Sequence, residues 1–188
     1  GSHSFGVRAK DPAGNTDATP ATYTWTVDTV GPDTSITANP PAVSNSAAAS
    51  FSFTSNEGGA TFECTLDLGA FTACTSPQAY SALAEGSHTF QVRASDGAGN
   101  TDATPASYTW SIDTVVPDTS ITANPPSPSA SGSASFSFTS PDGTATFECK
   151  LDTGTFAACT SPTAYSGLTD GNHTFSVRAK DPAGNVDA

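Results

Sequence analysis

The sequence predicts an all-β protein made of tandem two-layer sandwiches, and three observations support this fold class. First, the stretch GSHTFQVRASDGAGNTD at residues 86–102 occurs three times, beginning at residues 1, 86 and 171. Second, its first half alternates apolar and polar side chains, which is the period of a strand with one buried face. Third, turn residues recur about every 8 to 12 positions, a spacing typical of sandwiches of short strands.

The repeat sets the domain organisation. Residues 19–103 align with residues 104–188 without a gap, and 60 of the 85 positions are identical, so both copies should share one fold. Residues 28–33 and 113–118 each contain a proline. Because proline ends a strand and restricts its neighbour, we expect these segments to be the joints between domains. We therefore expect three parts: the C-terminal strands of a partial domain at 1–31, a complete domain at 32–116, and a domain lacking its last strand at 117–188.

The complete domain should contain seven short strands. In order, they are expected at residues 34–38, 50–55, 60–67 and 69–77, around Tyr80 and Leu83, at 88–94 and at 108–113. Apolar side chains alternate along them, as at Phe51 and Phe53 or at Trp110 and Ile112, which predicts one buried face per strand. Seven such strands in an 85-residue repeat are the pattern of an immunoglobulin-like or fibronectin-III-like sandwich.

The four cysteines form two pairs, each ten residues apart in a strand, turn, strand segment. They are Cys64 with Cys74 and Cys149 with Cys159. This arrangement favours a cross-strand disulfide in each repeat, which would stabilise the fold by about 2 to 3 kcal/mol. A zinc pair is the alternative, but no histidine is near in sequence and the spacing differs from that of zinc ribbons. Disulfides imply export to an oxidising compartment.

Composition restricts the function. Eighteen acidic and six basic residues give a net charge of −12, which disfavours binding to nucleic acid or to an anionic membrane. No run of 18 apolar residues is present, so this segment should not insert into a membrane. No nucleophile, base and orienting group fall into a catalytic pattern, and we expect no enzyme.

Two motifs resemble a known family. They are FEC-x-LD-x-G-x-F-x-x-C-TSP at residues 62–77 and the tail VRA-x-D-x-AGN-x-D at residues 92–102, and both recur one repeat later. The tail overlaps a longer run, from Tyr80 to Asn100. The run resembles the corner between the fifth and sixth strands of fibronectin type III domains and, more closely, bacterial immunoglobulin-like repeats of large secreted surface proteins and adhesins. This resemblance implies a stalk domain at the cell surface. The corner often holds tyrosine, where this chain has His88 and His173. We expect these histidines, with His3, to be half-buried structural groups and not ligands or bases.

Acidic loops predict a metal site at each joint. In an immunoglobulin-like sandwich, the B–C and F–G loops lie at the pole where the chain enters. Their carboxylates should therefore meet those of the joint, and Ca²⁺ binds six to eight oxygen ligands of this kind. The candidate ligands are Asp28, Asp33, Glu57, Asp96, Asn100 and Asp102 at the first joint and Asp113, Asp118, Asp142, Asp181, Asn185 and Asp187 at the second. Alternatively, these residues form turns that need no metal.

The expected function is a non-catalytic structural repeat that forms a rigid extracellular stalk or fibre, stiffened by calcium between domains. Its partners would be neighbouring copies of the same repeat in one long chain. One alternative is a filament subunit: residues 21–29, with Tyr23, Trp25 and Val27, would complete a neighbour's domain by donor-strand complementation. Another is an immunoglobulin-like module that binds carbohydrate or protein through its loops. No motif identifies a ligand at the tip of the stalk.

Overall fold

The computed structural model describes residues 1–188 and contains sixteen strands in five sheets, with no helix. The all-β prediction is therefore confirmed. No element could cross a membrane as a helix. Contacts divide the chain into two units, one of residues Gly1–Ala38, Ser52–Gln78 and Phe90–Tyr108, the other of residues Asn39–Phe51, Ala79–Thr89 and Thr109–Ala188.

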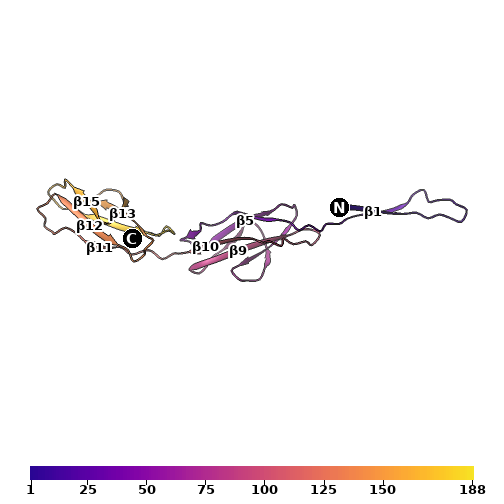
Figure 1. Cartoon of the computed structure of the whole chain (residues 1–188), viewed down its shortest axis with the longest axis horizontal. Coiled ribbons are helices and arrows are strands. Elements are labelled where there is room, and N and C mark those ends of the chain that lie inside the picture. Colours follow the sequence, from indigo (N-terminus) through magenta and orange to yellow (C-terminus); the bar gives the residue numbers. More distant parts are fainter. The chain divides into compact units, whose positions relative to one another are not determined.

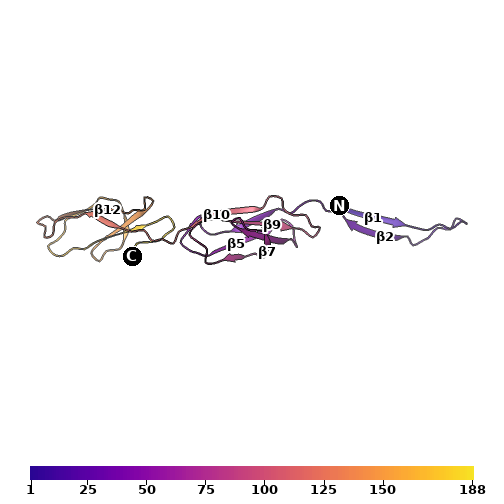
Figure 2. The same ribbon diagram turned by 90° about the horizontal axis from the view of Figure 1, so that it is seen from below.

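The chain begins with a two-stranded hairpin (Figure 2), in which β1 (Ser2–Val7) pairs antiparallel with β2 (Ala21–Thr26). His3 lies opposite Trp25 in the register, and their rings stack at 5.4 Å. The apolar side chains of this hairpin remain in water: Tyr23 is 69% exposed, Trp25 41% and Val27, just after β2, 43%.

The next part of the chain contains β5, β9 and β10, which Figure 1 labels. Its eight strands form two sheets, the larger with the order β4-β10-β9-β6-β7 and the smaller with the order β3-β5-β8. Such a pair of sheets is consistent with a β-sandwich. Their bounds are β3 Thr34–Ala38, β4 Val43–Ser44, β5 Ala49–Ser55, β6 Thr61–Leu66, β7 Thr72–Cys74, β8 Gln78–Tyr80, β9 Gly86–Ser95 and β10 Ala106–Ile112.

Two three-stranded sheets follow in the C-terminal part of the chain, with the orders β11-β12-β15 and β14-β13-β16. The bounds are β11 Ser120–Ala123, β12 Ser133–Thr139, β13 Thr146–Leu151, β14 Ala157–Cys159, β15 Thr163–Ser166 and β16 Phe175–Lys180. Because β13 and β14 begin and end 85 residues after β6 and β7, equivalent sequence forms equivalent strands here. β9 has ten residues, however, whereas β16 has six.

Aromatic side chains dominate the buried interior of each unit. In the first unit, Phe53 packs against Phe62 at 5.1 Å and against Phe90 at 6.0 Å, measured between ring centroids. In the second unit, Trp110 packs against Phe51 at 5.1 Å and against His88 at 5.5 Å. Such edge and tilted contacts are favourable arrangements for aromatic rings.

Both predicted cysteine pairs lie at disulfide distance and are bonded. The Cα atoms of Cys64 and Cys74 are 5.8 Å apart, as are those of Cys149 and Cys159. Each bridge joins two adjacent antiparallel strands, β6 to β7 and β13 to β14. Cys64 and Cys149 are buried, so each bridge reaches the core from a short edge strand.

Candidate functional site

The candidate site is built on the loop that follows β9. The Asp96 Oδ1 atom accepts hydrogen bonds from the backbone N–H groups of Ala98 and Asn100, both at 2.8 Å. Its Oδ2 atom accepts one from Asn100 Nδ2 at 2.8 Å. Gly99 has a φ of 92°, which glycine adopts without strain. Asp and Asn therefore close this loop by the side-chain turn chemistry that their sequence predicts.

These hydrogen bonds hold Asp96 ionised. The Asn100 side-chain amide is the largest influence and lowers the pKa of the Asp96 carboxyl below its ordinary value. Asp11 has the same contact with Asn15, and it lowers the pKa of Asp11 in the same direction. A carboxylate that accepts several N–H groups is stabilised in its charged form, so the loop presents negative charge at neutral pH.

The same asparagine also holds the preceding joint. Asn100 Nδ2 donates to the Asp28 carbonyl oxygen at 3.2 Å, and Asn185 Nδ2 donates to the Asp113 carbonyl oxygen at 2.8 Å. Gly31 lies close to the loop, because a Cβ atom at this position would meet the Thr101 carbonyl oxygen at 2.9 Å. We call the contact between this asparagine and the carbonyl oxygen of the joint the joint clamp. The sequence did not predict the joint clamp, because it indicated Asn100 and Asn185 only as candidate oxygen ligands of a metal ion.

Three of the predicted ligands come together at the first joint. Carboxylate oxygens of Asp28, Glu57 and Asp96 lie within 4.8 Å of one another. Glu57 is positioned by the turn after β5, where its N–H donates to Ser55 Oγ at 3.2 Å. Asp28 is exposed, and the other two are half-buried. Like charges at about 4 Å repel by about 1 kcal/mol even in water, so the trio would favour a bound cation.

The other predicted ligands of the first joint have structural contacts. Asp102 is buried, and its Oδ2 atom accepts the Thr34 N–H at 3.0 Å while its Oδ1 atom accepts the Thr104 N–H at 2.8 Å. Burial raises the pKa of Asp102, but these hydrogen bonds outweigh it and leave the pKa lowered. Asp33 uses its backbone N–H to bind Asn56 Oδ1 at 2.8 Å. Neither belongs to the trio.

No trio forms at the second joint. Asp142 occupies the position of Glu57 but is one methylene shorter, and its Oδ1 atom accepts both the N–H and the hydroxyl of Thr144, at 2.9 and 2.7 Å. Glycine stands at the position of Thr144 in the first repeat. Asp113 Oδ1 accepts the Val115 N–H, and both oxygens of Asp181 bind Asn185. Asp118 is exposed, and Asp187 is half-buried.

The two repeated histidines have structural partners. His88 is buried, and its Nε2 atom donates to the Ala84 carbonyl oxygen at 2.9 Å. His173 is exposed: its Nε2 atom donates to the Thr169 carbonyl oxygen at 2.9 Å, and its Nδ1 atom lies 2.8 Å from Asp152 Oδ2. His88 is therefore more buried than the half-buried group that the sequence predicts, whereas the His173 side chain, which is 26% exposed, is half-buried although the residue as a whole is exposed.

Comparison with known proteins finds likeness among solved structures. No protein family matches the chain, and no curated protein does. Among solved structures, the chain is similar to one described as "Crystal structure of tetra-tandem repeat in extending region of large adhesion protein", with 19% identity and a TM-score of 0.36. The match covers 99% of this chain and 54% of that one, so the chain spans about half the length of the structure that it resembles.

Proposed function

We propose that the chain is a non-catalytic structural module, an extracellular spacer in which immunoglobulin-like repeats of 85 residues follow one another through short, clamped joints. The joint clamp is the observation that best supports this function. Asn100 binds the Asp28 carbonyl oxygen and Asn185 binds the Asp113 carbonyl oxygen, and both pairs are 72 residues apart in sequence. A joint held by its neighbouring loop bends less freely than a solvated linker does.

Equivalent contacts support the assignment of a repeat. Cys64 lies opposite Val92 in the pairing of β6 with β9, and Cys149 lies opposite Val177 in the pairing of β13 with β16. Ala94 N–H donates to Thr34 Oγ1 at 2.9 Å, and Ala179 N–H donates to Thr119 Oγ1 at 2.8 Å. Proteins that use repeats as spacers gain length by adding such units.

The disulfides support an extracellular location, because such bonds persist in oxidising compartments and stabilise small domains there. Both ion pairs on the outer faces are also repeated: Arg93 binds Glu63 at 2.8 Å, and Arg178 binds Glu148 at 2.7 Å. The charged groups in these pairs, and the carboxylates that close loops, have roles in folding. We assign none of them a role in catalysis.

A double variant tests the spacer. Asn100→Ala with Asn185→Ala removes both joint clamps, and we expect small-angle scattering to show a wider distribution of molecular dimensions than in the parent protein. The matched control is Asn39→Ala with Asn124→Ala, because each of those amides binds only the carbonyl oxygen of the following proline. Equal distributions in the parent, the test variant and the control would contradict a clamped spacer.

We further propose that Ca²⁺ tightens the first joint. The support is the trio Asp28, Glu57 and Asp96, to which Ca²⁺ would add the charge that balances three carboxylates. No trio supports a matching site at the second joint.

Thermal melting with Ca²⁺ and with a chelator tests this proposal. A 100-fold excess over Kd would stabilise the folded state by about 2.7 kcal/mol. Glu57→Gln should abolish the gain, whereas Asp142→Asn, at the equivalent position of the second joint, should keep it. If the melting temperature is the same with Ca²⁺ and with the chelator, the calcium site does not exist.

A further inference from the structure

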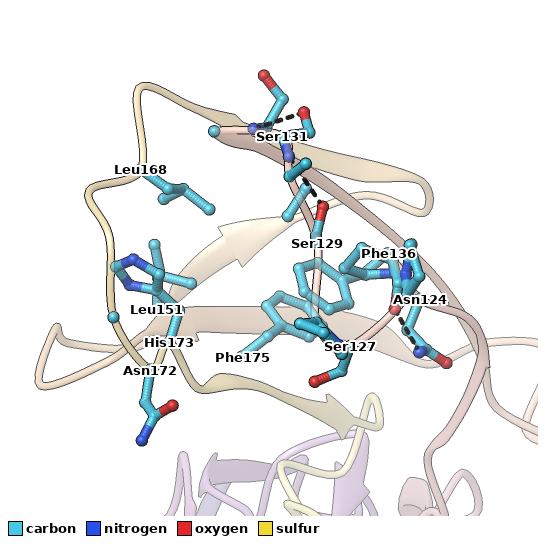
Figure 3. A pocket seen from close by; sticks show the side chains of 18 of the residues that line it. Asn124, Ser127, Ser129, Ser131, Phe136, Leu151, Leu168, Asn172, His173 and Phe175 are labelled. Carbon is cyan, nitrogen blue, oxygen red and sulfur yellow. Dashed lines mark hydrogen bonds between the residues drawn. The ribbon is translucent and has the colours of Figure 1, made fainter.

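The outer face of the sheet β14-β13-β16 carries a group of cations. Figure 3 shows Leu151 and Phe175 beside a cavity, which both residues line on the side of the sheet that faces β12. Side chains alternate between the two faces of a strand. Lys150 precedes Leu151 on β13 and therefore points to the outer face. Arg178 and Lys180 lie an odd number of residues after Phe175 on β16, so they share this outer face.

One aromatic ring positions two of these cations. The Lys150 Nζ atom lies 4.6 Å from the centroid of the Phe156 ring, and the Arg178 Cζ atom lies 4.1 Å from it. Such contacts are favourable because the face of an aromatic ring attracts cations. Arg178 also binds Glu148 at 2.7 Å, whereas neither lysine has a carboxylate partner. We call Lys150, Arg178 and Lys180 the basic face.

The basic face contains all the lysine and arginine side chains of its repeat. Residues 104–188 contain three such side chains and eight aspartate and glutamate residues. Glu148 pairs with Arg178, which leaves the charges of both lysines unbalanced. Complementary potentials direct the association of proteins. A positive face on an acidic chain therefore favours an anionic partner.

The complete repeat shows that its last strand leaves this face open. Arg93, the counterpart of Arg178, also lies over a phenylalanine ring, at 4.2 Å, and binds a glutamate at 2.8 Å. Its side chain is 34% exposed although β10 pairs with β9 there, and that of Arg178 is 36% exposed. Thr65 and Ser95 stand where the second repeat has the two lysines. The face is therefore neutral in the first repeat and positive in the second.

We propose that the basic face binds the trio Asp28, Glu57 and Asp96 of a second copy of this chain. The three carboxylates lie within 4.8 Å of one another, so they repel and lack the countercharge that the two lysines carry. The Glu57 carboxylate accepts no hydrogen bond within its own chain. A lysine ammonium has three N–H donors, so one lysine can bind carboxylates of two residues of the trio.

A second copy fits the basic face better than a long polyanion does. The net charge of −12 repels an extended anionic chain along its whole length. A compact trio brings its charge to one point. At physiological salt the Debye length is about 8 Å, so the more distant charges of two copies are largely screened from one another while groups in contact still attract.

The contact joins two different surfaces, so it can continue from one copy to the next. Exposed ion pairs are weak one at a time, and a single contact of this kind should be short-lived. Spacers that form several such contacts would hold one another more firmly, because linked weak contacts act together. An acidic spacer would in this way associate with its own kind.

This contact does not depend on Ca²⁺, although it uses the carboxylates of the proposed calcium site. A bound Ca²⁺ ion would compete with the lysines for the same oxygens. The measurements are therefore made with a chelator present. A chain that binds no Ca²⁺ can still form the contact, and a chain that forms no contact can still bind Ca²⁺, so the two proposals fail separately.

Carbodiimide cross-linking tests which groups meet. The reagent joins a lysine amine to a carboxylate that it contacts, and a mixture of isotope-labelled and unlabelled copies distinguishes links between copies from links within one. Mass spectrometry should find mixed-isotope peptides that join Lys150 or Lys180 to a residue of the trio. The matched control is Asp118, an exposed carboxylate at the second joint. Yields to Asp118 as high as those to the trio would overturn the proposal.

Sedimentation of a concentration series tests the charges. The parent protein should associate, and Lys150→Thr with Lys180→Ser should abolish the association. The fold accepts these substitutions, because the first repeat carries the same residues in equivalent strands. Asn39→Asp with Asn124→Asp reaches the same net charge at exposed positions and should still associate. Equal loss in both double variants would show that net charge and not the basic face is responsible, which overturns the proposal.

The acidic side of the contact has its own test. Glu57→Gln should weaken the association, whereas Asp142→Asn should keep it, because Asp142 belongs to no trio. A parent protein that stays monomeric at every concentration would overturn the second copy as the partner. Binding to a heparin column that is lost in Lys150→Thr with Lys180→Ser would then identify a polyanion in its place.

Discussion

The two repeated histidines show how strongly its surroundings determine the contacts of a side chain. His88 lies beside Trp110 and is buried. His173 occupies the same position one repeat later. One of its ring nitrogens faces Asp152 and the other faces the Thr169 carbonyl oxygen. Both ring nitrogens therefore meet acceptors, an arrangement that only the doubly protonated ring satisfies completely.

This contact predicts a pH dependence. The hydrogen bond to Asp152 is the main reason that the pKa of His173 is raised, and the same bond lowers the pKa of Asp152. The contribution of His173 to the stability of the folded state is complete below about pH 6.5, the pKa of an unfolded histidine. It is lost as the pH rises through the raised pKa of His173. The contribution of Asp152 is complete above its ordinary pKa of 3.8 and is lost as the pH falls through its lowered pKa.

NMR titration of the His173 ring should show the raised pKa, and Asp152→Asn should lower it. Asp170→Asn, which changes a carboxylate close in sequence but not in this hydrogen bond, should leave the pKa of His173 raised. A His173 pKa that does not change in Asp152→Asn would show that another group is its partner.

A second prediction concerns the buried face of β9. Val92 is fully buried, and Val92→Thr keeps its shape but places a hydroxyl in an apolar environment. We expect a loss of about 1 to 3 kcal/mol in the free energy of unfolding. Val43→Thr, on a partly exposed strand of the same sheet, should change stability by less than about 0.5 kcal/mol. Chemical denaturation measures both, and equal losses would contradict the assigned burial.

At the scale of elements, the disulfides should contribute equally in the two repeats. Cys64→Ala with Cys74→Ala removes the bridge between β6 and β7, and Cys149→Ala with Cys159→Ala removes the bridge between β13 and β14. Each closes a loop with a sequence separation of ten, so each removal should cost about 2 to 3 kcal/mol. Denaturant titration of the two variants measures this cost. Unchanged stability in either would show that the bridge does not constrain the unfolded chain.

Most strands could be predicted from alternation alone. The expected strand at residues 34–38 is β3, and the one at 50–55 is β5 with one more residue. β4 was missed, because two residues, Val43 and Ser44, are too few to show a period. Its pairing with β10 is fixed by tertiary contacts that lie more than 60 residues apart in sequence, which local patterns do not record.

The candidate site was predictable in its parts but not in its geometry. The sequence predicted that Asp96 and Asn100 either bind a metal or form a turn, and in the structure they hydrogen-bond to each other within a turn. It did not separate Glu57 from Asp142, although one methylene and the presence of Thr144 decide which carboxylate is free to join a trio. Asp102 has the same residue type as the other candidates, yet its burial and its contact with Thr34 give it a structural role. Burial of this kind depends on the whole fold.

At the scale of the whole molecule, stability should be unevenly distributed. The segments FQVRA at residues 90–94 and FSVRA at residues 175–179 are nearly identical, but Phe90 and Val92 are fully buried while Phe175 and Val177 are half-buried. Hydrogen exchange should therefore be faster in residues 175–179 than in residues 90–94, because protection reflects local burial. Mass spectrometry of the two peptides tests this. Equal protection would contradict the exposure of β16.

The short disulfide loops have a mechanical consequence. If the chain is pulled from its ends, the residues between Cys64 and Cys74 cannot extend, since their Cα atoms stay 5.8 Å apart, whereas ten extended residues would span about 33 to 36 Å. Single-molecule pulling should therefore release roughly 30 Å less contour length for each intact bridge than after reduction. A chain built in this way resists full extension under tension, and the reducing power of its surroundings sets how far it can stretch.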